Sequence, residues 1–174
     1  RALASYAWEE AEAHFRRGLA AREGQPVDDE IATLLVGLGR AQAVLGRLEE
    51  SAGSLFPAFE WFEKLGDGVH AAAITDYLRW APSMSEWFQV QHRALHLVPP
   101  DSLEAARVIS GYSMVWAALN NGYEEAQQNF ARALAISHRE GDAFLEMWTL
   151  ERASHIARLY LRWQEALDLA SQAL

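Results

Sequence analysis

The chain has 174 residues, and its 51% hydrophobic content is sufficient for one domain with a sizeable core. Its formal net charge of -9 argues against direct binding of nucleic acids, because an acidic protein repels their phosphate groups. The absence of cysteine excludes disulfides, thiolate nucleophiles and cysteine-based zinc sites, and it predicts a reducing compartment, the cytoplasm.

Apolar residues recur at helical spacing along the whole chain, and turn residues divide the pattern into short helices. The chain begins with a helix around residue 8, and the spacing then predicts the first helix of a pair in residues 31–45, 69–80, 103–119 and 144–161. A second helix follows each of these, beginning near residues 48, 84, 123 and 163. Turn residues separate the helices: Gly24, Gly46, Gly66, Pro82, Pro100, Gly122 and Gly141. The sequence therefore predicts nine helices in antiparallel pairs and no strand.

Residues 8–11, 48–51, 123–126 and 163–166 share one sequence pattern, and residues 84–87 are a degenerate fifth copy. The last residues of the copies, at positions 11, 51, 87, 126 and 166, are 40, 36, 39 and 40 residues apart. Glutamate directly precedes all five, which suits the first turn of a helix because negative charge favours a helix N-terminus. A period of this length predicts a stack of helical repeats.

Part of this pattern resembles the tetratricopeptide repeat (TPR), in which paired helices stack into a solenoid. The matching residues are Leu38-Gly39, Gly46, Leu48-Glu49-Glu50, Tyr123-Glu124-Glu125-Ala126, Phe130 and Ala133-Leu134. The resemblance covers essentially the whole chain. It implies an all-α, right-handed α-solenoid of about nine helices, a single repeat domain over residues 1–174, and a role in protein interaction.

The repeat length of about 40 residues is similar to that of the TPR-like domain in maltose-regulator and LuxR-type large bacterial transcriptional regulators. That resemblance implies a sensor or autoinhibitory arm beside an ATPase switch and an output domain. The chain also opens on Arg1 and closes on Leu174 within a helical pattern that lacks a stop signal. We therefore expect a fragment of a longer multidomain protein, whose uncovered end faces around Leu3 and Tyr6, and around Leu167 and Leu174, favour self-association.

The sequence predicts no enzyme, no metal site and no cofactor. Its six histidines are dispersed, and for His92 and His96, which are four residues apart on one helical face, no third metal ligand is indicated. No Gly-x-Ser-x-Gly motif follows a predicted strand, as the nucleophile of an α/β-hydrolase requires. No apolar stretch approaches the roughly 20 residues that a membrane-spanning helix needs. Binding is the function that remains.

Binding in a solenoid of this kind commonly uses the concave side, which the first helix of each pair lines. Positions 18, 15, 11 and 8 residues before the last residue of each pattern copy share one face of that helix. The candidates with charged or aromatic side chains on this face are Arg40, Asp76, Arg79, Trp148, Glu151, His155 and Arg158. Arginine can hold a carboxylate or phosphate with two hydrogen bonds. The alternative is a structural role, in which Asp76 pairs with Arg79 and Glu151 pairs with Arg158.

Two functions are compatible with these features. The first is a non-catalytic scaffold that binds a protein, a peptide or another domain of the same chain in its concave groove, within a bacterial signalling or transcriptional regulator. The second is a small-molecule effector-sensing domain of an ATP-dependent transcriptional regulator, using the same groove. The candidates do not reproduce the lysine and asparagine clamp of chaperone-binding members of the family, so a chaperone tail is not the expected partner.

Overall fold

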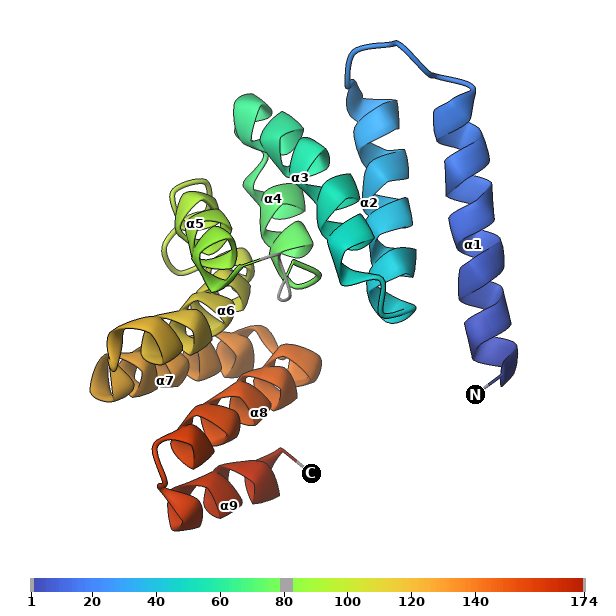
Figure 1. Ribbon diagram of the computed structural model, residues 1–174. Coiled ribbons are helices and arrows are strands. Elements are labelled where there is room, and N and C mark those ends of the chain that lie inside the picture. The colour runs from blue at the N-terminus through green and yellow to red at the C-terminus, as the bar shows by residue number, and fades with distance from the viewer. Residues whose placement is uncertain (1, 79–82, 174) are drawn as a thin grey trace. The chain divides into compact units, whose positions relative to one another are not determined.

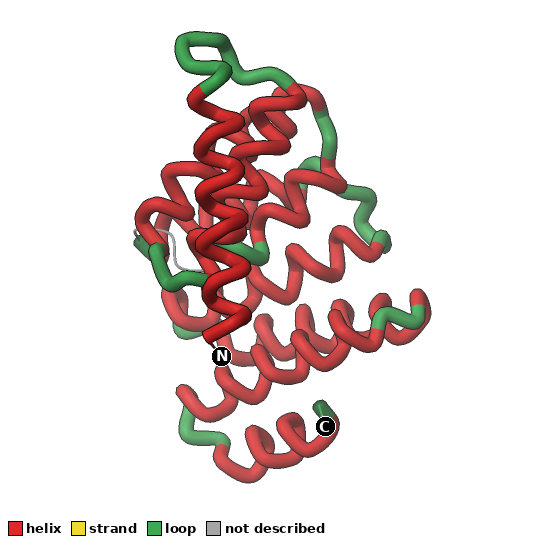
Figure 2. Tube along the Cα trace, turned by 90° about the vertical axis from the view of Figure 1, so that its right-hand side faces the viewer, coloured by secondary structure: helices red, strands yellow, loops and turns green. Residues whose placement is uncertain are grey.

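Every regular element in the described part of the chain is an α-helix. The computed structural model describes residues 2–78 and 83–173, with side chains from residue 7 onward in these ranges. Nine helices and no strand are present there, as the sequence predicts (Figures 1 and 2). The helices are α1 (Ala2–Ala20), α2 (Asp29–Val44), α3 (Leu48–Leu65), α4 (Gly68–Thr75), α5 (Met84–Leu95), α6 (Leu103–Asn120), α7 (Tyr123–Glu140), α8 (Ala143–Leu159) and α9 (Trp163–Gln172).

The first helices of the pairs, α2, α4, α6 and α8, each begin with a side-chain cap. The capping oxygens accept backbone N–H bonds of 2.8 to 3.1 Å and belong to Asp28, Asp67, Ser102 and Asp142. Such caps satisfy N–H groups that have no partner in the first turn of a helix. The second helices α3, α7 and α9 have no side-chain cap, and their first turns carry glutamates of the repeat instead. These glutamates supply the negative charge that the helix N-terminus favours.

Each described turn within a pair passes through one residue with a left-handed backbone. These residues are Gly46 (φ 77°), Asn121 (φ 54°) and Leu161 (φ 60°). Glycine adopts this conformation freely and asparagine tolerates it, but the Cβ atom of leucine makes it strained. The α8–α9 turn therefore holds a strained residue where the α2–α3 turn uses glycine.

Helix α4 is shorter than the sequence predicts. The periodicity indicates a helix over residues 69–80, but α4 ends at Thr75. The Thr75 hydroxyl donates to the Ala72 carbonyl oxygen at 2.7 Å, and such side-chain bonds compete with the helical backbone pattern. Residues 79–82 lie outside the described ranges, so the predicted end of this helix falls there.

The chain forms two compact units, Arg1–Trp87 and Phe88–Leu174. In the first unit, α1 contacts α2, α2 contacts α3, and α3 contacts α4. The buried hydrophobic residues of these helices include both alanines and large side chains, and they are Ile31, Ala32, Leu38, Ala41, Ala52, Leu55, Ala58, Phe59, Phe62, Ala71, Ala72 and Ile74.

Helix α2 approaches both of its neighbours closely because two of its residues are glycine. A Cβ atom on Gly39 would lie 2.4 Å from Leu55 Cγ, and one on Gly37 would lie 2.4 Å from the Phe15 ring. The Ser51 hydroxyl donates to the Gly39 carbonyl oxygen at 2.8 Å, which joins α2 to α3 at the same place. The Leu38-Gly39 part of the repeat pattern thus marks a point of helix contact.

In the second unit, α6 contacts α7 and α8, α7 contacts α8, and α8 contacts α9. A cluster of buried residues from all four helices forms its core, and it contains Ala117, Tyr123, Ala126, Phe130, Ala153, Ile156, Ala157 and Ala166. Tyr160 packs against this cluster, and its hydroxyl donates to the Ala117 carbonyl oxygen at 2.7 Å. The repeat positions read from the sequence are therefore the packing positions of this unit.

Replacing Gly39 with alanine should lower the free energy of unfolding by about 1–3 kcal/mol, because the new methyl group would overlap Leu55. The matched control is Gly53→Ala in α3, where an added Cβ meets no atom within 4 Å. This control should raise stability by up to about 1 kcal/mol, since alanine favours a helix over glycine. Urea denaturation of both variants measures the difference, and equal stabilities would contradict the close contact at Gly39.

Replacing Leu161 with glycine should raise the free energy of unfolding by about 1 kcal/mol, because glycine relieves the strain of a positive φ. Leu161 is 70% exposed, so little packing is lost. The Gly46→Ala variant should lose a similar amount, since only its φ of 77° opposes the new Cβ atom. A Leu161→Gly protein that unfolds at a lower urea concentration than the parent would contradict strain at this turn.

Candidate functional site

Three of the seven candidate residues gather in one hollow between α8 and α9. Glu151, His155 and Arg158 come from α8, one to two helical turns apart, and Ser154 lies beside them. Ala170 and Ala173 form the opposite wall, and the hollow has a volume of about 280 Å³. The helical spacing read from the sequence thus places these three charged or polar side chains on one surface of the second unit.

The hollow exists because α9 carries small residues where other second helices carry large ones. Ala170 lies four residues after Ala166, and the equivalent residues Leu55 and Phe130 are both buried. Leu55 fills the space against Gly39 in the first unit, whereas Ala170 is exposed. Because Ala170 has no large side chain, the wall of the hollow leaves room for a group of a binding partner.

One hydrogen bond within the hollow joins Arg158 to His155. Arg158 Nη2 lies 3.1 Å from His155 Nδ1, and because a guanidinium only donates, the ring nitrogen is the acceptor in this bond. Arg158 thus bonds to His155, and the structural alternative of a Glu151–Arg158 ion pair is not found between these described residues. Glu151 is exposed, and its carboxylate faces solvent.

Trp148 lies on the same helix, two turns before His155, and it is partly buried. Its ring packs against Phe144, with centroids 5.5 Å apart, and lies 5.4 Å from the guanidinium carbon of Arg152. Arg152 is 1% exposed and donates to the Ser110 hydroxyl at 3.1 Å. The indole therefore covers a buried arginine, so Trp148 contributes to packing as well as to the surface.

The candidate residues of the first unit differ from one another in their exposure. Arg40 is exposed, and its guanidinium carbon lies 5.0 Å from the centre of the Tyr77 ring, a cation–π contact. Asp76 lies at the end of α4 and is partly buried. Arg79 lies outside the described residues, so the alternative of an Asp76–Arg79 pair stays untested.

On α6, the face equivalent to the one that carries the candidate residues is largely buried. Val108 and Val115, which the spacing puts in line with the other candidates, are both 0% exposed, and Gly111 is buried. A Cβ atom on Gly111 would lie 2.6 Å from the Gln91 side chain of α5. Val108, Gly111 and Val115 on this face of α6 therefore serve packing, and within the second unit it is α8 whose equivalent face carries the exposed charges of Glu151 and Arg158.

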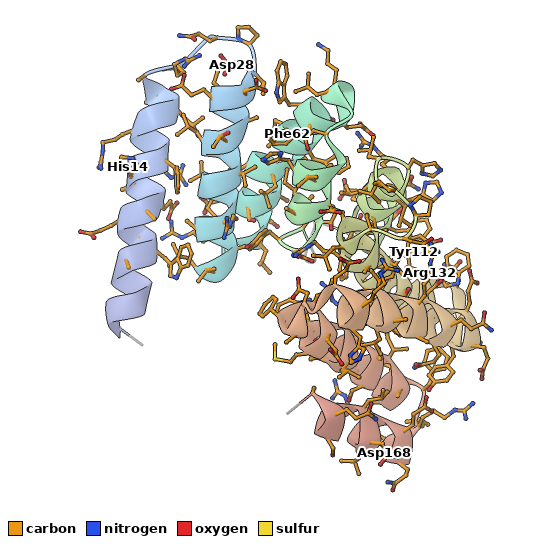
Figure 3. All side chains as sticks on the ribbon, turned by 180° about the vertical axis from the view of Figure 1, so that it is seen from behind. His14, Asp28, Phe62, Tyr112, Arg132 and Asp168 are labelled. Atoms are coloured by element: carbon orange, nitrogen blue, oxygen red, sulfur yellow. The ribbon has the colours of Figure 1, made fainter. Side chains whose placement is uncertain are left out.

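A second hollow of the same unit was not indicated by the sequence reasoning. It has a volume of about 270 Å³ and is lined by Leu95, Pro100, Ala105, Ile109, Tyr112, Asn129 and Arg132. Tyr112 and Arg132 lie close together in it (Figure 3). Burial, with a contribution from Glu125, raises the pKa of the Tyr112 hydroxyl. Arg132 Nη2 donates to the Pro100 carbonyl oxygen at 2.6 Å, which holds the guanidinium at the rim.

The early end of α5 creates this second hollow. Helix α5 has 12 residues, whereas α3 and α7 have 18 each, so α5 leaves part of its neighbours uncovered. The sequence signal that could have located it is the Pro99-Pro100 pair, which prevents the helix from continuing.

The described residues contain no cluster of three or more histidine, aspartate or glutamate side chains that could hold a metal ion. None of the described helices combines the length and the apolar character needed to cross a membrane. The predicted end faces are only partly described: Leu167 is 63% exposed, and the side chains of Leu3, Tyr6 and Leu174 lie outside the described set.

The arrangement of helices has counterparts among solved structures. BtubC (BKLC) from P. vanneervenii matches with a TM-score of 0.70 and 18% identity, over 96% of this chain and 72% of BtubC. A putative kinesin light chain from Podosopora anserina with nearly identical TPR-like repeats matches with a TM-score of 0.65 and 13% identity, over 95% of this chain and 85% of that one. A second crystal structure of that kinesin light chain, of a variant form, gives a TM-score of 0.67 and 12% identity, over 95% and 84%.

No family model matches the chain, and no curated protein sequence matches it. At 12 to 18% identity, the structural matches establish the fold. The fold class is that of the all-α solenoids built from TPR-like helix pairs.

Proposed function

We propose that this chain is a non-catalytic module that binds a protein or peptide through a groove on the first helices of its pairs. The observation that carries the proposal is the α8–α9 hollow, where Glu151, His155 and Arg158 lie together beside small residues. Helical repeats of this class commonly bind partners through extended surfaces formed by equivalent helices. Arg40 and Asp76 of the first unit belong to the same proposed set, as does Arg79.

The side chains of the hollow suit a peptide chemically. Arg158 keeps further N–H donors after its bond to His155, and the Nε2–H of His155 is a second donor, so both can bind a carboxylate or a backbone carbonyl. Glu151 can accept from a backbone N–H or a lysine of the partner. A peptide presents donors and acceptors of both kinds along its length, so it can engage all three side chains.

The alternative is a small-molecule effector, and the sizes of the hollows favour a peptide over it. Ligand pockets commonly have about 300–1,000 Å³ and enclose most of the ligand. The two hollows of the second unit have about 270 and 280 Å³. A larger one of about 540 Å³ is lined only by residues of α1, so a single helix forms its wall.

The context in a bacterial signalling or transcriptional regulator, and the cytoplasmic location, belong to the same proposal. The repeat length of about 40 residues supports the first, and the absence of cysteine supports the second. The sequence of the complete gene tests the regulator context. A phosphate-binding loop before this region and a helix-turn-helix domain after it are the expected findings.

Selection of binding peptides from a displayed random library should yield peptides that depend on the α8–α9 hollow. Their affinity should fall at least fivefold, about 1 kcal/mol, in the Glu151→Ala and Arg158→Ala variants, as for an interface hot spot. Both residues are exposed, so the melting temperature should stay unchanged. Arg17→Ala, which changes an exposed arginine of α1, is the control and should bind as the parent does. Selected peptides that bind both hollow variants with parental affinity would contradict the proposed groove.

A further inference from the structure

The last turn of the first helices carries an exposed apolar residue at a repeated position. This position lies two residues before the left-handed residue of the turn. It is occupied by Val44 in α2, Leu119 in α6 and Leu159 in α8, which are 53%, 48% and 54% exposed. The described first helices that end in such a turn thus share one feature that packing alone does not account for.

The second helices have the opposite chemistry at the same position. Two residues before Gly66 and Gly141, which end α3 and α7, stand Lys64 and Arg139. A basic residue is the expected choice there, because positive charge favours the C-terminal end of a helix. At this position the first helices therefore have an exposed apolar side chain in place of a charge that would favour the end of the helix.

The turns themselves do not require these apolar residues. The turns after α2 and α8 are closed by backbone bonds of 2.9 Å, from Arg47 N–H to the Gln42 carbonyl and from Arg162 N–H to the Ala157 carbonyl. The apolar contact that often accompanies a turn of this kind joins positions other than the last helical residue. Val44 and Leu159 therefore do not stand at the positions of that apolar contact, and about half of each side chain is exposed.

In the second unit these residues form a continuous feature. Helices α6 and α8 contact each other, and the Tyr160 hydroxyl donates to the Ala117 carbonyl oxygen at 2.7 Å, so the C-terminal ends of these two helices, which carry Leu119 and Leu159, lie against each other. Leu161, 70% exposed, follows in the turn after α8. We call Leu119, Leu159 and Leu161 the apolar edge.

Leu161 strengthens the case for a binding role because its backbone is strained. Its φ of 60° would be free of strain for glycine, which the α2–α3 turn uses. A residue held in such a conformation with its side chain in solvent does not improve stability, and strain of this kind is concentrated at functional sites.

The residues that flank Leu159 and Leu161 in the chain are basic. Arg158, which precedes Leu159, bonds to Nδ1 of the His155 ring. Arg162, which follows Leu161, lies 3.5 Å from Glu124, with 55% and 81% of their side chains exposed, and a pair this exposed is weak. The net charge of -9 of the whole chain is screened beyond about 8 Å at physiological salt, so nearby groups set the local charge, and of the three named here two are arginines and one is Glu124.

We propose that the apolar edge docks an amphipathic helix of a protein partner, with acidic residues of that helix facing Arg158 and Arg162. Residues seven apart on a helix lie about 10 Å apart on nearly the same face, which matches the expected spacing of Leu119 and Leu159. This proposal rests on the protein-binding function proposed above, but its apolar contacts lie outside the α8–α9 hollow.

The probe is a synthetic 18-residue amphipathic helix with leucine at positions seven apart along one face and glutamate beside them. Its binding to the full chain is measured by fluorescence anisotropy. The doubly substituted Leu119→Ser, Leu159→Ser protein should bind it at least about tenfold more weakly, because both apolar contacts are lost. The matched control is Leu65→Ser, Val69→Ser, which changes two residues of the first unit that are 54% and 59% exposed, and it should bind as the parent does.

Two further variants sharpen the test. A probe with lysine in place of every glutamate should bind at least about tenfold more weakly than the glutamate probe, because it would face Arg158 and Arg162. The Leu161→Gly protein should be more stable than the parent and yet bind the glutamate probe more weakly. A loss of binding that merely followed a loss of stability could not produce these opposite changes.

Several outcomes would overturn the apolar edge. They are no binding of the glutamate probe to the parent protein, equal binding of the lysine probe, or parental binding by the Leu119→Ser, Leu159→Ser protein.

The Glu151→Ala variant distinguishes this proposal from the groove proposed above. If library-selected peptides lose affinity in Glu151→Ala while the glutamate probe binds the edge variant as it binds the parent, the groove stands and the edge fails. If the edge variant loses the glutamate probe while Glu151→Ala affects no peptide, the edge stands and the groove fails.

Discussion

The repeat depends on close contact between the two helices of a pair, at points where a side chain is absent or small. In the first unit, the backbone of Gly39 lies against Leu55, and the Ser51 hydroxyl joins the two helices beside it. In the second unit, Ala126 is 0% exposed, and Phe130 of the same helix shares one core cluster with residues of α8. The small residue of the pattern is thus buried, and the large residue four positions later packs on a neighbouring helix: Leu55 on α2, and Phe130 in a cluster with α8. The period of about 40 residues is the length of chain needed to repeat these two contacts.

The sequence predicts this packing well because the same residue types recur at the same offsets. The nine helices of the described ranges, the contacts within the pairs α2–α3, α6–α7 and α8–α9, and the buried small residues follow from the repeat pattern. The prediction from the sequence is less successful where one helix differs from the equivalent helices of the other repeats. Helix α4 ends at Thr75 although the apolar spacing continues beyond it, so periodicity overestimates the length of this helix. Valine and glycine on one face of α6 have the spacing of a surface, yet neighbouring helices cover them, and a helical period alone does not say which face is covered.

Helical spacing likewise predicts only part of the candidate site. It indicates Glu151, His155 and Arg158, because residues at this spacing lie on one face of a helix. The sequence did not predict the apolar residues at the helix ends, because an apolar residue in a helical pattern is normally assigned to the core. Only their exposure in the structure, together with Lys64 and Arg139 at the same position of the second helices, separates Val44, Leu119 and Leu159 from packing residues.

The main contacts within each unit join helices that are adjacent in the chain, with α6 and α8 the exception among those described, and even these are separated by one helix. Contacts of this kind close only short loops of chain. Proteins rich in local contacts fold in microseconds to milliseconds, because little chain entropy is lost before a contact stabilises the structure. Folding of each unit therefore does not need distant parts of the chain to meet before its first helix contacts form.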